Sequence, residues 1–254
     1  MPVIKTTQDM IFYARIGQNS AFPLLLIHGA GSSHLVWSAA LRRFSGRRVL
    51  AIDLPGHGRS SKKGYDSVNA YTDSVLSLMK KLESDTFIPV GHSLGGAVTQ
   101  MLAIEAPERI AGLVLIGTGA KLPVNPQLLD LFLQDRESAI NRINEWQWSK
   151  DTPDSIKEKS LAAMQTVPEA IYHGDYLACN NFDLSSRLHE ISAPTLVLAG
   201  EHDRMVKPAI SEALAKGIPN AQFIQVKDAG HMLPLEQSEL VAQYIQTWLE
   251  GQAL

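Results

Sequence analysis

The 254-residue sequence contains one cysteine, Cys179, so it can form neither an internal disulfide bond nor a cysteine-based zinc cluster. Long apolar runs are also missing, since none approaches the roughly 20 residues that a membrane-spanning helix requires. The first residues lack the basic and then apolar pattern of a secretory signal. These absences predict a cytoplasmic protein without a transmembrane segment.

The sequence has no large excess of either charge. Its 23 lysine and arginine residues and 26 aspartate and glutamate residues give a formal net charge of −3. Because the basic residues are scattered, the sequence predicts no surface for nucleic acid and no membrane partner. We expect a small-molecule substrate, and nothing in the sequence calls for a metal, a nucleotide or a flavin.

Strand-like apolar runs alternate with helical patterns over most of the chain. Strands are predicted at residues 10–16, 24–27, 48–52, 86–90, 110–116, 194–200 and 221–226, and helices at 34–44, 67–82, 97–104 and 235–249. Such alternation is typical of an α/β fold with a mostly parallel central sheet flanked by helices. Residues 121–189 have only helical patterns, and we expect them to form a helical cap inserted into a core of residues 1–120 and 190–254.

The sequence Gly-His-Ser-Leu-Gly-Gly at residues 91–96 lies between a predicted strand and a predicted helix. A serine in this setting occupies a strained turn that raises its hydroxyl above the sheet. Gly91 and Gly95 allow the strand and the helix to pass closely. The N-terminus of the helix would direct its N–H groups to the place where negative charge develops during acyl transfer. Ser93 is therefore the predicted nucleophile.

Two later loops, each following a predicted strand, supply an acid and a base. In serine hydrolases built on parallel sheets, the partners follow the nucleophile in the order acid, then histidine. Asp203 and His231 satisfy this order. We expect His231 to take the serine proton and later deliver it to the leaving alcohol, while Asp203 orients the imidazole. Glu201 and Asp228 are alternatives for the acid that are explained more simply as solvated loop charges.

An oxyanion hole requires two backbone donors. The first is predicted to be the N–H of Leu94, the residue that follows the nucleophile. The second should come from the loop after an early strand, where residues 28–33 read His-Gly-Ala-Gly-Ser-Ser. We assign it to the N–H of Ala30, and we expect His28 to fix the loop rather than to react.

Taken together, these motifs resemble the α/β-hydrolase superfamily, in particular its esterase-like branch with a small helical cap. The matching segments are residues 28–31, 53–60, 91–96, 200–203 and 230–231. The resemblance implies an α/β-hydrolase fold and a serine esterase that cleaves carboxylic esters through an acyl-enzyme. We interpret residues 53–60 as a structural loop beside the nucleophile turn.

The residue types at single positions distinguish this sequence from several other families of the superfamily. Haloalkane dehalogenases and epoxide hydrolases have an aspartate where Ser93 stands, and hydroxynitrile lyases typically have a threonine and a lysine where Gly29 and Met232 stand. Carbon–carbon bond hydrolases, enol-lactonases and cofactor-free perhydrolases share the same triad and remain alternatives. A ligand receptor that retains the triad without turnover is an alternative from another class.

The predicted cap is rich in apolar and aromatic side chains. They are Phe132, Leu133, Trp146, Trp148, Met164, Tyr172, Tyr176 and Phe182. An apolar cap over the predicted nucleophile favours small to medium hydrophobic substrates. The predicted catalytic segments contain no cluster of arginine or lysine, so we expect no basic side chain that is dedicated to binding a charged group of the substrate. Arg204 is assigned a surface role.

Overall fold

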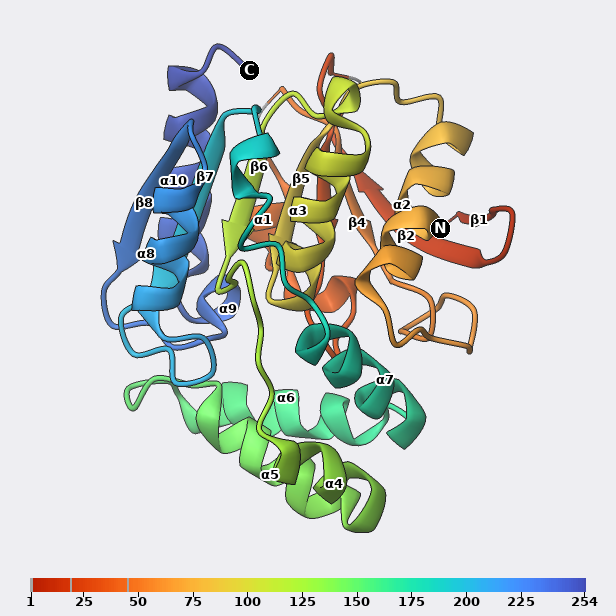
Figure 1. Ribbon diagram of the computed structural model, residues 1–254, viewed down its shortest axis with the longest axis vertical. Helices are drawn as coiled ribbons and strands as arrows, with labels where there is room; N and C mark the ends of the chain where they lie inside the picture. The colour runs from red at the N-terminus through yellow and green to blue at the C-terminus, as the bar shows by residue number, and fades with distance from the viewer. Residues whose placement is uncertain (1, 19, 45) are drawn as a thin grey trace.

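The computed structural model describes residues 2–18, 20–44 and 46–254, and its centre is an eight-stranded sheet (Figure 1). The strands are β1 (Val3–Lys5), β2 (Met10–Ile16), β3 (Leu24–Ile27), β4 (Val49–Ile52), β5 (Ile88–His92), β6 (Leu113–Ile116), β7 (Thr195–Gly200) and β8 (Ala221–Val226), in the order β1-β2-β4-β3-β5-β6-β7-β8. β2 pairs antiparallel with β1 and β4, whereas β3 to β8 pair in parallel. The predicted mostly parallel sheet is confirmed.

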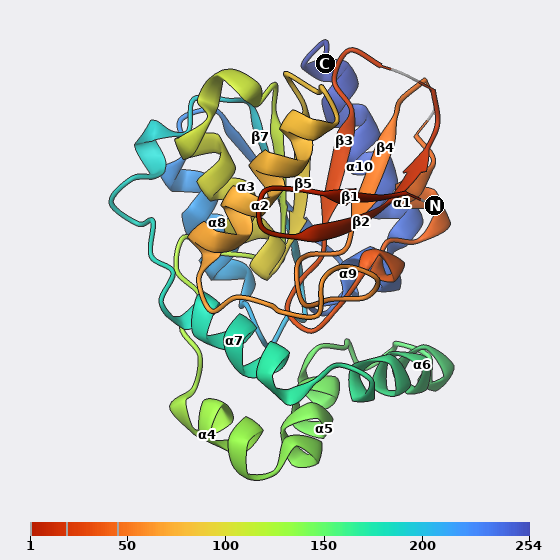
Figure 2. The same ribbon diagram turned by 90° about the vertical axis from the view of Figure 1, so that its right-hand side faces the viewer.

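The central strands are continuously apolar because helices cover both faces of the sheet. In β3, for example, Leu25 and Ile27 belong to one buried cluster, whereas Leu24 and Leu26 belong to another on the opposite face. Helices α2 (Val68–Lys81), α3 (Leu94–Glu105) and α8 (Pro208–Gly217) cover the first face, and α1 (Ala39–Arg42) and α10 (Ser238–Gly251) cover the second (Figure 2). The sheet is thus the middle of three layers.

Four consecutive helices between β6 and β7 lie beyond the carboxyl ends of the parallel strands (Figures 1 and 2). They are α4 (Pro126–Gln134), α5 (Arg136–Trp146), α6 (Asp154–Gln165) and α7 (Glu169–Asn180), and we refer to them as the cap helices. They enclose a cluster of their own that includes Phe132, Ile140 and Tyr172. Functional sites of parallel α/β sheets collect at this end of the strands, so the cap helices cover the expected place.

Two segments that were each predicted as one continuous helix are divided into two helices in the structure. The segment 34–44 forms a short 3₁₀ turn, His34–Val36, and then α1, because Trp37 and Ser38 are extended and the Ser38 side chain accepts the Leu41 N–H to begin a new helix. The segment 235–249 is likewise divided at Gln237, between α9 (Leu233–Glu236) and α10. Neither β1 nor α8 was among the predicted elements.

The boundaries of most predicted strands agree with those of the structure to within two or three residues. Within the part of the chain that the structure describes, no helix is long and apolar enough to cross a bilayer.

Candidate active site

Ser93 lies at the junction of β5 and α3 in a left-handed conformation, with φ 53° and ψ −117°. A non-glycine residue in such a conformation costs about 1–3 kcal/mol and persists only where its surroundings enforce it. Here a Cβ on Gly91 would lie 2.1 Å from the Gly95 carbonyl oxygen, and a Cβ on Gly95 would lie 2.2 Å from that of Ile27. Both positions therefore require glycine, as the motif predicts.

Asp203 and His231, which are 28 residues apart in sequence, form a buried hydrogen-bonded pair. The Nδ1 atom of His231 lies 2.8 Å from Oδ2 of Asp203. The other carboxylate oxygen of Asp203 accepts the backbone N–H groups of Met205 and Val206, at 2.9 and 2.8 Å. These contacts fix the carboxylate in one orientation, with one oxygen directed at the histidine.

The two alternatives for the acid, Glu201 and Asp228, lie near His202. Glu201 and Asp228 are exposed, and each has a carboxylate oxygen 3.9 Å from Nε2 of His202. His231 faces Asp203 instead, so the geometry favours Asp203 as the partner of the predicted base.

His92, to which the sequence assigned no role, holds the backbone of His231. Its Nε2 donates to the His231 carbonyl oxygen at 2.9 Å, and the two rings lie 4.8 Å apart. Burial lowers the pKa of His92 to about 3, so the ring is neutral. Its Nδ1 has no hydrogen-bond partner among the described residues and packs against Gly29, where a Cβ would lie 3.1 Å away. Its place inside the Gly-x-Ser motif was the only signal in the sequence.

The loop that carries His231 is tied to the cap helices through Glu236. The Gly230 N–H donates to the Glu236 carboxylate at 3.0 Å. The same carboxylate accepts the Ser149 N–H and the Thr152 hydroxyl, from the loop between α5 and α6, at 2.9 and 2.6 Å. The cap and the histidine loop are therefore positioned together.

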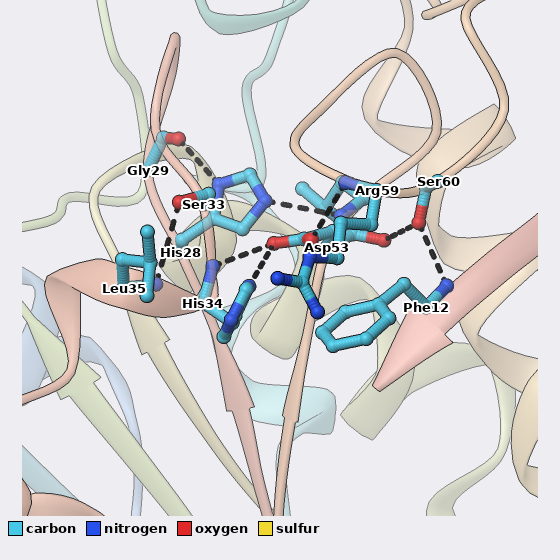
Figure 3. A network of polar contacts seen from close by, with 10 residues as sticks. Phe12, His28, Gly29, Ser33, His34, Leu35, Asp53, Arg59 and Ser60 are labelled. Carbon is cyan, nitrogen blue, oxygen red and sulfur yellow. Dashed lines mark hydrogen bonds and ion pairs between the residues drawn. The ribbon is translucent and has the colours of Figure 1, made fainter. Parts of the chain in front are cut away.

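Residues 28–33 follow β3, and we call them the oxyanion loop after their predicted role. The loop begins with His28, whose ring is hydrogen-bonded on both sides (Figure 3). His28 Nε2 accepts the Leu54 N–H at 3.0 Å, and Nδ1 donates to the Gly29 carbonyl oxygen at 2.8 Å. Burial lowers the pKa of His28 to about 4, which agrees with a neutral ring that both accepts and donates. His28 thus fixes the loop, and Ala30 and Ser93 line the same cavity.

Asp53 holds His34, the residue that follows the oxyanion loop, as Figure 3 shows. Its Oδ1 accepts both the backbone N–H and the ring Nδ1 of His34, at 2.7 and 2.8 Å, and its Oδ2 accepts the Arg59 N–H at 2.9 Å. Burial acts to raise the pKa of Asp53, but hydrogen bonds from His34 and Arg59 bring it below the ordinary value. These contacts support the interpretation of residues 53–60 as structural.

We expect the loop of residues 53–60 to require glycine at position 58. It has a φ of +51°, and a Cβ would lie 2.3 Å from Oδ2 of Asp53. Gly46 is a matched control, because its φ is +70° but a Cβ would meet nothing within 4 Å. Both Gly→Ala substitutions impose backbone strain, so the clash should make Gly58→Ala lower the free energy of unfolding by about 1–3 kcal/mol more than Gly46→Ala. Urea unfolding measures both, and equal losses would contradict the predicted clash.

A cavity of about 600 Å³ lies between the oxyanion loop, Ser93, His231 and the cap helices. Most of its side chains are apolar: Ala30, Leu35, Val36, Ile143, Ile156, Ala163, Met164, Val167, Tyr172, Tyr176, Met205, Met232 and Leu235. The lining also includes Lys159 of α6. Lys159 is exposed, and the expectation that no basic side chain is dedicated to binding a substrate charge stays a prediction. Helical periodicity alone does not show which face of α6 meets the cavity, so the sequence could not place Lys159 in its lining.

A second hollow, of about 760 Å³, lies behind Asp203. Its lining is more polar and includes Asn144, Lys157 and His202, but neither Ser93 nor His231. It therefore does not reach the predicted nucleophile. Arg204, which also lines it, is exposed and donates to the backbone carbonyl of Glu145 in α5, in agreement with the expected surface role.

Comparisons with known proteins cover nearly the whole chain. The model of the Alpha/beta hydrolase family matches residues 24–244. A 2-hydroxymuconate semialdehyde hydrolase from Pseudomonas putida is 31% identical over 93% of this chain and 90% of its own length, and a pimeloyl-[acyl-carrier protein] methyl ester esterase from Aromatoleum aromaticum is 29% identical over 90% and 98%. The solved structure of a thermophilic esterase from Thermogutta terrifontis has a TM-score of 0.89 at 27% identity, covering 99% of this chain and 98% of its own.

Proposed function

Because the chain belongs to the alpha/beta hydrolase family, we propose that it is a serine hydrolase that cleaves carboxylic esters of small to medium hydrophobic substrates through an acyl-enzyme. One observation carries the proposal: Ser93, on its strained turn, lines the same cavity as His231, whose ring is hydrogen-bonded to the buried Asp203. A nucleophile, a base and a group that orients the base are the parts that acyl transfer requires.

In the proposed reaction, Ser93 Oγ attacks the acyl carbon and His231 Nε2 takes the hydroxyl proton. Asp203 supports this assignment because it accepts from Nδ1 and so leaves Nε2 as the basic nitrogen. Collapse of the tetrahedral intermediate breaks the bond to the alcohol, which leaves with the proton from His231. Water then attacks the acyl-enzyme with the same base, releasing the acid and restoring Ser93.

The backbone N–H groups of Leu94 and Ala30 are proposed to stabilise the oxyanion. Leu94 is the first residue of α3, so its N–H belongs to the positive end of the helix dipole. Ala30 borders the cavity in the oxyanion loop, which His28 holds at its start and which Asp53 anchors just beyond its end, at His34. Preorganised donors of this kind act where charge develops in the transition state, and losing one costs about 10²–10³ in kcat.

A ladder of p-nitrophenyl esters from acetate to dodecanoate tests the substrate class. The apolar lining and the volume of about 600 Å³ favour a short to medium acyl chain, so kcat/KM should peak there and fall for the longest chains. Ile143→Trp, which would occupy part of the cavity, should move the peak to shorter chains. A flat profile, or an unchanged peak in the variant, would contradict the assignment of this cavity as the acyl site.

A second candidate is a carbon–carbon bond hydrolase or enol-lactonase. The Pseudomonas putida relative, a hydrolase of 2-hydroxymuconate semialdehyde, favours it, as does Lys159, an exposed residue of the cavity lining whose ammonium group would suit a substrate that carries a carboxylate. Turnover of 2-hydroxymuconate semialdehyde with little turnover on any p-nitrophenyl ester would support this candidate over the esterase.

A further inference from the structure

We infer that Asp175 of cap helix α7 is a positioning residue that holds the oxyanion loop through Gly31, so that the cap helps to build the site as well as to cover it. The inference rests on the proposed function, because it concerns the donor assigned to Ala30. Its basis is a fully buried carboxylate with three hydrogen-bond donors from three parts of the core.

The carboxylate of Asp175 joins the cap to the core. Its Oδ2 accepts the Gly31 N–H and His57 Nε2, each at 2.8 Å, and its Oδ1 accepts the Tyr71 hydroxyl at 2.6 Å. Gly31 lies in the oxyanion loop, His57 in the loop after β4 and Tyr71 in α2. A buried acceptor that replaces the water around all three donors fixes their relative positions.

Gly31 is held from two directions by one face of α7. It has a φ of +59°, and a Cβ would lie 2.0 Å from Cε1 of Tyr172, which is one turn before Asp175 on the same helix. Asp175 fixes the direction of the Gly31 N–H, while the Tyr172 ring limits how far its Cα moves. Because Gly31 follows Ala30 directly, the cap positions the Ala30–Gly31 peptide, which adjoins the Gly29–Ala30 peptide that carries the proposed oxyanion donor.

The geometry makes His57 an imidazolium. Its Nδ1 lies 2.9 Å from the Pro55 carbonyl oxygen and its Nε2 lies 2.8 Å from Asp175, so both ring nitrogens face acceptors and both must carry protons. Burial by itself lowers the pKa of His57, but the negative charge of Asp175 outweighs it and the pKa is raised. Asp175 is therefore one half of a buried ion pair, and its bond to Gly31 is charge-assisted.

His28, whose ring lies 4.8 Å from that of His57, stays neutral in this arrangement. Two like charges at that distance in a dry site would repel one another. The Gly29 carbonyl of the oxyanion loop is thus held by a neutral histidine, and the Gly31 N–H by a charged pair that includes the cap residue Asp175.

The test compares Asp175→Asn with Tyr71→Phe in steady-state ester hydrolysis. Asn keeps the shape of the side chain but loses the charge, so the Gly31 bond weakens. Tyr71→Phe removes one donor to the same carboxylate and leaves the Gly31 and His57 bonds in place. We expect kcat of Asp175→Asn to fall about 10- to 100-fold with KM nearly unchanged, since a donor displaced by a fraction of an ångström weakens transition-state binding only. Tyr71→Phe should keep kcat within about threefold.

Two further measurements separate positioning from a loss of folded protein. Titration of the reactive serine with a fluorophosphonate gives kcat per active site, which a purely structural defect would not change. Affinity for a trifluoromethyl ketone that forms a tetrahedral adduct should fall by the same factor as kcat/KM. If Asp175→Asn does not fold, the double variant Asp175→Asn with His57→Gln removes both buried charges and is expected to show the same loss of kcat.

The outcomes distinguish the two proposals. A wild-type enzyme without turnover on esters would overturn the proposed function. An active wild type with kcat per site unchanged in Asp175→Asn, or with the loss confined to KM, would overturn the positioning role and leave the esterase proposal intact.

Discussion

Replacing Ser93 by alanine is expected to lower kcat for ester hydrolysis by about 10⁶-fold, the magnitude that follows loss of a serine nucleophile. Alanine keeps the Cβ and meets the same left-handed backbone at φ 53°, so the turn should survive and the free energy of unfolding should change little. The measurement is kcat on the best p-nitrophenyl ester, with urea unfolding of both proteins.

A matched control is Ser160→Ala, because Ser160 also lines the cavity but lies on α6. Its kcat should stay within about threefold of the wild type, which separates loss of the nucleophile from loss of any lining hydroxyl. Substantial turnover by Ser93→Ala, in a preparation free of contaminating esterase, would contradict the assignment of the nucleophile.

The second large effect is expected for Asp203→Asn, which should lower kcat by about 10⁴-fold with little change in KM. The reason is in the local hydrogen bonds. The Asn carbonyl oxygen would keep the backbone N–H groups of Met205 and Val206, which now bind Oδ1 of Asp203. Its amide group would then face His231 Nδ1 and donate to it, so Nε2 would carry the proton and could not accept one from Ser93.

Asp228→Asn and Glu201→Gln are the controls for this prediction. Both residues are exposed and neighbour the same loops, and their variants should keep kcat close to that of the wild type. A loss in Asp228→Asn that equals the loss in Asp203→Asn would move the role of the acid to Asp228.

The parts of the site that could be predicted from sequence are those encoded by short segments. The turn at Ser93 depends on glycines two residues to either side, and the contacts that require them, from Gly91 to Gly95 and from Gly95 to Ile27, follow from any close strand–helix crossing. Asp203 and His231 can be predicted because each follows the carboxyl end of a strand, and parallel strands bring those ends together.

The parts that could not be predicted depend on how distant segments pack. His57 and Asp175 are 118 residues apart, and nothing in either local sequence indicates that the cap helix reaches the loop after β4. The place of Lys159 in the cavity lining could not be predicted for the same reason, since the orientation of α6 over the cavity is set by tertiary contacts. The break before α1 came from a side-chain cap at Ser38, a signal that the apolar pattern of residues 34–44 obscured.

The most direct measurement of the central claim is the covalent intermediate itself. Mixing the enzyme with p-nitrophenyl acetate and quenching in acid should give a burst of p-nitrophenolate stoichiometric with enzyme, and mass spectrometry should locate the acetyl group on Ser93. Ser93→Ala should show neither the burst nor the acetylated peptide. Turnover without a burst or acylation at Ser93, or an acyl group on a different residue, would contradict the proposed mechanism.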